Sequence, residues 1–212
     1  MKRTTSIGAL RTGAGAATLA AAMLLTGCGA EGDEPADRTS VQDQQINPGG
    51  PTAPTDAPFV VASLAWPAPG DWTYVEPDTE FRAAEFRVTT DAGDCEVVFF
   101  HFGRGQGGDA EANLMRWARV MLDESGEPVE PEIEVFDVSG VRTVAAEYRG
   151  TYMAGPPMGE KTAMENHALL GAVVEGGPEG NVFIRLTGPA DAVDAVRDEW
   201  LTMLRGVRSA GA

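Results

Sequence analysis

The sequence predicts an α+β domain in which a mostly antiparallel β-sheet is flanked by two main helices. Three observations support this fold class. Every Trp, Phe and Tyr lies at or after Phe59, so the part of the chain that can build a core begins there. Two pairs of apolar runs are joined by glycine-containing turns, which predicts hairpins. Two further segments carry apolar residues at helical spacing, and helices of this kind pack their apolar side on a sheet.

The first half of the domain predicts strands. Residues 59–64 form a short apolar run, and residues 66–72 are rich in turn-forming proline and glycine. Residues 81–88 alternate loosely between apolar and polar. Residues 95–102 are apolar on both faces, which is typical of a central strand. A glycine-rich run, 103–108, follows that strand.

A first helix is expected immediately after this run. Asp109 is a good N-cap, and Leu114, Trp117 and Met121 follow at helical spacing. Gly126 is a plausible C-terminal stop. We therefore expect this helix to include Met121.

The second half predicts two hairpins and a closing helix. Strands 133–138 and 141–152 are joined by Ser139-Gly140, and residues 153–166 form a loop. Strands 167–175 and 182–187 flank a Gly/Pro-rich turn. Pro189 suits the first position of a helix. The apolar stripe of that helix consists of Val193, Val196, Trp200, Met203, Leu204 and Val207.

The N-terminal segment has the features of an export signal. Basic residues, Lys2, Arg3 and Arg11, precede a charge-free apolar run, 14–25, that is shorter than the ~20 residues of a spanning helix. The run ends in Leu25-Thr26-Gly27-Cys28, which resembles the lipobox of bacterial lipoproteins. That resemblance implies cleavage before Cys28, attachment of lipid to its thiol and acylation of the new amino group.

These features divide the chain into four predicted parts. They are a signal peptide (1–27), a lipidated Cys28 with a flexible linker (28–58), the globular domain (59–208) and a short tail (209–212). The linker holds five prolines and no aromatic residue, so it has too little apolar surface to fold. We expect a cell-envelope protein held at a membrane and facing the periplasm or exterior. Gly29, rather than an aspartate, favours the outer membrane.

The net charge argues against two classes of partner, and the cysteine content argues against a disulfide within the domain. The whole chain has a net charge of -16, and removal of the signal peptide leaves 13 basic against 32 acidic residues. This charge argues against binding to nucleic acid or anionic lipid headgroups. With Cys28 lipidated, Cys95 has no disulfide partner, and we expect it to be buried on a strand.

The glycine-rich run and the helix after it are the candidate ligand or partner loop. Gly103, Gly105 and Gly108 spell G-x-G-x-x-G, but the parallel βαβ context of a dinucleotide site is missing. Backbone N–H groups and the helix N-terminus could instead receive an anion, helped by Arg104 and Arg116. The opposing interpretation is a sharp turn, with Asp109 occupying the anion position and Asn113 bonding back to the loop. The full candidate set is Gly103, Arg104, Gly105, Gln106, Gly107, Gly108, Asn113 and Arg116.

No catalytic, metal or cofactor site is predicted. Cys95 and His101 lie on one face of a strand but lack the paired spacing of zinc ligands, and His167 has no nucleophile partner in sequence. Trp66 and Trp72 are expected to pack on the sheet. No lipase-type G-x-S-x-G or zincin H-E-x-x-H motif is present.

Two resemblances extend this interpretation. Trp-Pro-x-Pro-x-x-Trp from Trp66, together with the two separated helices and Leu-Thr-Gly-Pro before the second, resembles the PsbP-like α/β/α sandwich. The run from Phe102 to Gly108 with Asn113, Arg116 and Trp117 is similar to a group of bacterial lipoproteins. The first implies a non-catalytic accessory or binding role, with an envelope protein as a possible partner, and the second implies an address in the envelope but no particular activity. The alternative is an envelope enzyme, or a binder of small anions or carboxylates at Gly103–Arg116.

Overall fold

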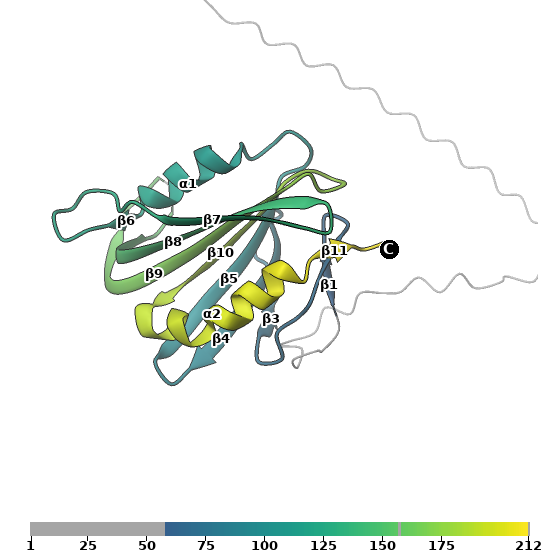
Figure 1. Ribbon diagram of the computed structural model, residues 1–212. Helices are drawn as coiled ribbons and strands as arrows, with labels where there is room; N and C mark the ends of the chain where they lie inside the picture. The colour runs from purple at the N-terminus through teal and green to yellow at the C-terminus, as the bar shows by residue number, and fades with distance from the viewer. Residues whose placement is uncertain (1–57, 157, 212) are drawn as a thin grey trace, which may run out of the picture. The chain divides into compact units, whose positions relative to one another are not determined.

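The computed structural model describes residues 58–156 and 158–211 (Figure 1). The signal peptide, Cys28 and nearly all of the linker lie outside the described residues. The elements in chain order are β1 (Phe59–Val61), β2 (Leu64–Trp66), β3 (Thr73–Val75), β4 (Arg82–Thr90), β5 (Gly93–His101), α1 (Ala110–Ala118), β6 (Met121–Leu122), β7 (Glu132–Val138), β8 (Val141–Ala154), β9 (Thr162–Glu175), β10 (Val182–Pro189), α2 (Ala190–Arg205) and β11 (Arg208–Ser209).

An eight-stranded sheet forms the centre of the domain. Its strand order is β3-β4-β5-β10-β9-β8-β6, and β7 pairs with the same edge of β8 as β6 does. Every pairing is antiparallel. The predicted fold class, a mostly antiparallel sheet with two main helices, is therefore confirmed.

The two helices cover opposite faces of this sheet (Figure 1). On β9, Leu170 belongs to the core under α2, whereas its neighbour Leu169 belongs to the core under α1. This alternation follows from the two-residue period of a strand. Trp200 of α2 and Trp117 of α1 are each buried against their own face. Trp66 is also fully buried, so the predicted packing of this residue is confirmed.

Helix α1 is shorter than the spacing predicted. It ends at Ala118, so the expectation that it includes Met121 is wrong. Met121 instead pairs with Tyr152 of β8, and its carbonyl accepts a hydrogen bond from the amide of Val129 at 2.9 Å. Met121 is apolar because it is buried in the sheet, and its helical spacing from Trp117 is therefore not evidence of a longer helix. Gly126, with a φ of 86°, belongs to a turn after β6 and does not end the helix.

The predicted hairpins are confirmed, with longer strands than expected. Ser139 and Gly140 both have positive φ, 52° and 83°, as the tight turn between β7 and β8 requires. β8 extends to Ala154 and β9 begins at Thr162, so the expected loop 153–166 is shorter in the structure. Pro189 was expected at the first helical position, but it is the last residue of β10 and the N-cap of α2, one position before the first helical residue, Ala190.

A second, three-stranded sheet consists of β1, β2 and β11. Strands β1 and β2 form a hairpin whose turn residues, Ala62 and Ser63, both have positive φ. Arg208 and Ser209 of β11 pair with the other edge of β2. This sheet packs on the same core as α2, with Leu64 among its buried residues. In the described ranges, no helix has the length and apolarity needed to span a membrane.

Candidate functional site

The structure brings most of the glycine-rich candidate residues into one braced loop between β5 and α1. Gly103, Gly105, Gly107 and Gly108 all have positive φ. A Cβ at Gly107 would lie 2.5 Å from the ring of Phe183, so only glycine fits there. The glycines are therefore needed for the path of the chain and for close packing on β10.

Asn113 is buried and holds this loop to the helix. Its Nδ2 donates to the carbonyl oxygens of Gly107 at 3.0 Å and Asp109 at 2.8 Å. Its Oδ1 accepts a hydrogen bond from Nη1 of Arg116 at 2.5 Å. The bond back to the loop backbone, which the sequence suggested, is therefore present.

Groups of the same chain already bind the N-terminus of α1 and the guanidinium of Arg104. Oδ1 of Asp109 accepts a hydrogen bond from the amide of Ala112 at 2.8 Å, which confirms the predicted N-cap. Arg104 donates to the carbonyl of Pro178, in the turn between β9 and β10. Gln106 is exposed, and its amide bonds to the carbonyl of Gly103 at 3.2 Å. Arg104 and Arg116 are thus held by different segments.

The remaining sequence candidates are separated. Cys95 is fully buried, as expected, and burial raises the pKa of its thiol to about 11. His101, six positions further along β5, contacts the carbonyl of Glu179 through Nε2 at 3.1 Å. Nδ1 of His167 lies 2.8 Å from the carbonyl of Glu165. Among residues 58–156 and 158–211, no three His, Cys, Asp or Glu side chains are grouped to hold a metal.

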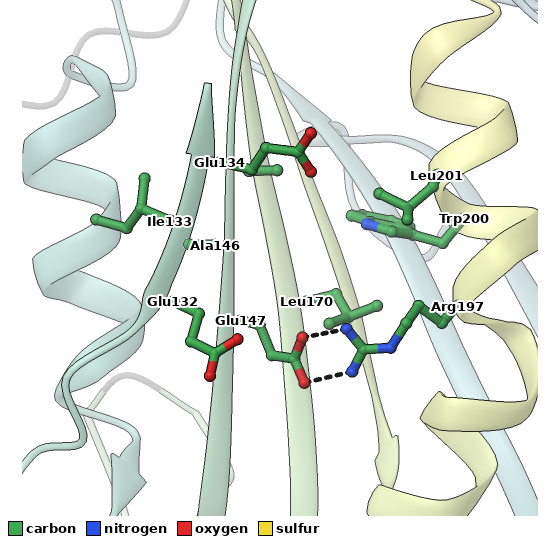
Figure 2. Close-up of a pocket in the computed structure, with 10 residues that line it drawn as sticks. Glu132, Ile133, Glu134, Ala146, Glu147, Leu170, Arg197, Trp200 and Leu201 are labelled. Atoms are coloured by element: carbon green, nitrogen blue, oxygen red, sulfur yellow. Dashed lines mark hydrogen bonds and ion pairs between the residues drawn. The ribbon is translucent and has the colours of Figure 1, made fainter. Parts of the chain in front are cut away.

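A groove that the sequence analysis did not identify lies between β7 and α2 (Figure 2). Its volume is about 210 Å³. Ala145 of β8 and Leu170 of β9 line it from the sheet, and Trp200 and Leu201 line it from α2. Because Ala145 is small, β8 leaves space under the helix that a larger side chain would fill. The groove therefore has an apolar floor between two polar walls.

One wall is held in place by a network of ion pairs. Arg197 of α2 forms a two-bond pair with Glu147 of β8, drawn as dashed lines in Figure 2. Arg149 contacts the same carboxylate, Nε to Oε1, at 2.7 Å and also pairs with Asp194. Asp194 lies 3.2 Å from Arg197, which closes the network between β8 and α2.

This network sets the charge state of the groove. The hydrogen bond from Arg197 is the largest influence on Glu147 and lowers its pKa below the ordinary value. The bond from Arg149 does the same for Asp194. The pKa values of Arg197 and Arg149 are raised, chiefly by their bonds to Glu147 and Asp194 respectively. All four groups are therefore fully charged at neutral pH.

The other wall is acidic. Glu134 of β7 pairs with Arg205 of α2 at 2.8 Å, and that guanidinium lies over the ring of Phe136. A neighbouring hollow of about 340 Å³ continues the groove past Glu130 and Glu132. Within the described part of the chain, these two carboxylates have no ion-pair partner. Every arginine around the groove is paired, so the excess charge on its rim is negative.

A pattern in the sequence could have indicated this groove. Glu130, Glu132 and Glu134 occupy alternate positions of the sequence, and the last two lie on one face of β7, which begins at Glu132. The partner wall could not be found in the same way, because Arg197 and Glu147 are fifty positions apart. Only the topology of the sheet brings them together.

Some solved structures of other proteins are similar to this chain. No family model and no curated protein matches the sequence. The chain is similar to the solved structure of cyanobacterial PsbP (CyanoP) from Synechocystis sp. PCC 6803, with 16% identity and a TM-score of 0.45, over 70% of this chain and 87% of that one. It is also similar to LpqN, described as involved in cell envelope biogenesis of Mycobacterium tuberculosis, with 12% identity and a TM-score of 0.47, over 77% of this chain and 86% of that one.

Proposed function

We propose that this chain is a lipid-anchored protein of the bacterial cell envelope whose globular domain is a non-catalytic binding module. Its location is supported by the export signal that ends in Leu25-Thr26-Gly27-Cys28. Acyl chains on Cys28 give stable membrane attachment, because each buried CH₂ contributes about 0.8 kcal/mol and two or more chains are present. Gly29 favours the outer membrane as the site of attachment.

The binding role depends on one observation, the groove between β7 and α2. It combines an apolar floor with charged walls, which is the usual composition of a ligand or partner site. A general acid or base works best with a pKa near the operating pH. The pKa values of Glu147 and Asp194 are lowered and that of Arg197 is raised, so these groups are suited to fix charge and shape rather than to transfer protons.

The anchor is tested by replacing its attachment residue. In cell fractionation, we expect the native chain in the membrane fraction, and we expect the Cys28→Ala variant to carry no lipid and to keep residues 1–27, because its lipobox lacks the Cys. Mass spectrometry of the native N-terminus should show a lipidated Cys28 after loss of residues 1–27. Cys95→Ala is the matched control and should stay at the membrane. An uncleaved N-terminus with a free Cys28 thiol would overturn the proposed location.

The binding site is tested by placing a photo-crosslinking amino acid at single positions of the anchored chain. Leu201 lies in the groove, whereas Gln106 lies in the exposed glycine-rich loop. We expect a discrete adduct in native membranes from position Leu201 and none from Gln106 or from exposed Met158. A discrete adduct from Gln106 alone would reject the groove and favour the glycine-rich loop.

A further inference from the structure

Strand β7 ends the sheet with an open edge. Its seven residues pair with β8 on one side, and no other strand in the described ranges pairs with them on the other. An open edge presents backbone N–H and C=O groups that can pair with another extended chain. The neighbouring Pro128 and Pro131 restrict such pairing to the strand itself, because proline has no N–H to donate.

The two faces of β7 differ in character. Ile133 and Val135 pair in register with Ala146 and Val144, on the face that α1 covers, yet their own side chains are 56% and 51% exposed. Glu132 and Glu134 point to the groove side (Figure 2). Beside residues 132–135, an added strand would therefore meet apolar side chains on one face and carboxylates on the other.

We propose that the open edge of β7 binds an extended segment of another envelope polypeptide, in which apolar and basic side chains alternate. Main-chain hydrogen bonds to β7 would provide affinity. Apolar side chains would cover Ile133 and Val135, and Lys or Arg side chains would face Glu132 and Glu134. This inference rests on the proposed binding function and names the kind of partner that meets the acidic wall of the groove.

Charge argues against the two alternative occupants within reach of the sequence. A second copy would add the same three carboxylates, Glu132, Glu134 and Asp137, to an edge that is already acidic, and it would bring no basic side chain to pair with them. The chain's own linker, 28–58, has six acidic residues and one basic residue, Arg38, as well as five prolines. It matches neither the charge nor the hydrogen bonding that the edge requires.

The proposal is tested with a capped heptapeptide of alternating lysine and valine. Its affinity is measured by calorimetry against the full chain carrying Cys28→Ala, in neutral detergent. The Cys28→Ala chain reports on peptide binding at the edge of β7 whether or not the native protein is lipidated. Failure of the peptide to bind is therefore distinct from failure of the proposed lipid anchor. We expect saturable binding that weakens as salt is added, and no binding of the matching glutamate–valine peptide.

Matched variants test separately the contributions of the apolar face, the acidic face and the backbone edge of β7 to peptide binding. Ile133→Lys and Glu132→Lys should each weaken binding about fivefold or more. Val60→Lys, at an equally exposed valine of β1, and Glu124→Lys, in a turn, should leave it unchanged. N-methylation of alternate peptide amides along one edge should abolish binding. Binding that survives methylation of each of the two edges in turn would overturn strand addition. A dimer that Ile133→Lys dissociates in sedimentation would show that a second copy is the occupant.

Discussion

Gly171 is the residue that lets α1 approach the sheet. A Cβ at this position of β9 would lie 2.3 Å from two ring atoms of Trp117. The backbone of Gly171 has no unusual conformation, so the requirement is for space alone. Trp117 is in turn buried and anchors the short helix α1 to the sheet.

We therefore predict that Gly171→Ala destabilises the domain. Trp117 would have to leave its position, and overpacking of this kind costs about 1–3 kcal/mol. Urea unfolding followed by tryptophan fluorescence measures the change. Gly211→Ala, where no atom lies within 4 Å of the added Cβ, is the control and should have little effect. Equal stability of the Gly171→Ala variant and the native chain would contradict this account of α1 docking.

Cys95 is predicted to be unreactive in the folded state. Burial is the main cause of its raised pKa, about 11 against an ordinary 9.0. In the Cys28→Ala chain, a thiol reagent at pH 8 should label Cys95 only after denaturant is added. Folding favours the protonated thiol, so this contribution to stability is complete below pH 9 and is lost as the pH rises toward 11. Fast labelling without denaturant would show that β5 opens locally.

At the scale of elements, ion pairs fix α2 to β8. Glu147 contacts both Arg197 and Arg149, and its side chain is largely buried. Trp72 adds a second attachment, because its Nε1 donates to Glu199 of α2 at 2.9 Å. On the opposite face, the hydroxyl of Tyr148 donates to the carbonyl of Leu114 at 2.8 Å and ties α1 to the same strand, β8.

The α2 network gives the domain a defined acid sensitivity. Because the pKa values of Glu147 and Asp194 are lowered, their contribution is present above the ordinary values of 4.5 and 3.8 and is lost as the pH falls below them. We predict that Glu147→Gln lowers the free energy of unfolding at pH 7 by about 1–3 kcal/mol. The difference from the native chain should shrink between pH 5 and pH 3 in urea titrations. Glu124→Gln is the control, and a deficit that stays constant with pH would contradict the ion-pair explanation.

The sequence predicted elements best where local chemistry decides them. Ser139-Gly140 marked the turn of the first hairpin, and Asp109 marked the start of α1. The end of α1 could not be predicted, because Met121 satisfies a helical spacing and a buried sheet position equally well. Its pairing with Tyr152 is a tertiary contact that overrides the local pattern.

At the scale of the whole molecule, the fold class followed from the sequence and the groove did not. Apolar periodicity and turn residues record how each element is buried, and this was enough for a two-helix antiparallel sheet. A groove depends on which side chains of different elements face each other. Glu134 meets Arg205, and Glu147 meets Arg197, only after β7, β8 and α2 have packed. The braced loop at Asn113 was accessible to prediction because its contacts are local.

The three-stranded sheet has a consequence for how the domain can be handled. Its first strand, β1, and its last, β11, run in the same direction on either side of β2, about 10 Å apart, so the polypeptide enters opposite Trp66 and leaves opposite Leu64. A unit with such closely spaced entry and exit points can be spliced into a surface loop of a carrier protein without stretching the host. The domain could thus be inserted into another protein as one unit.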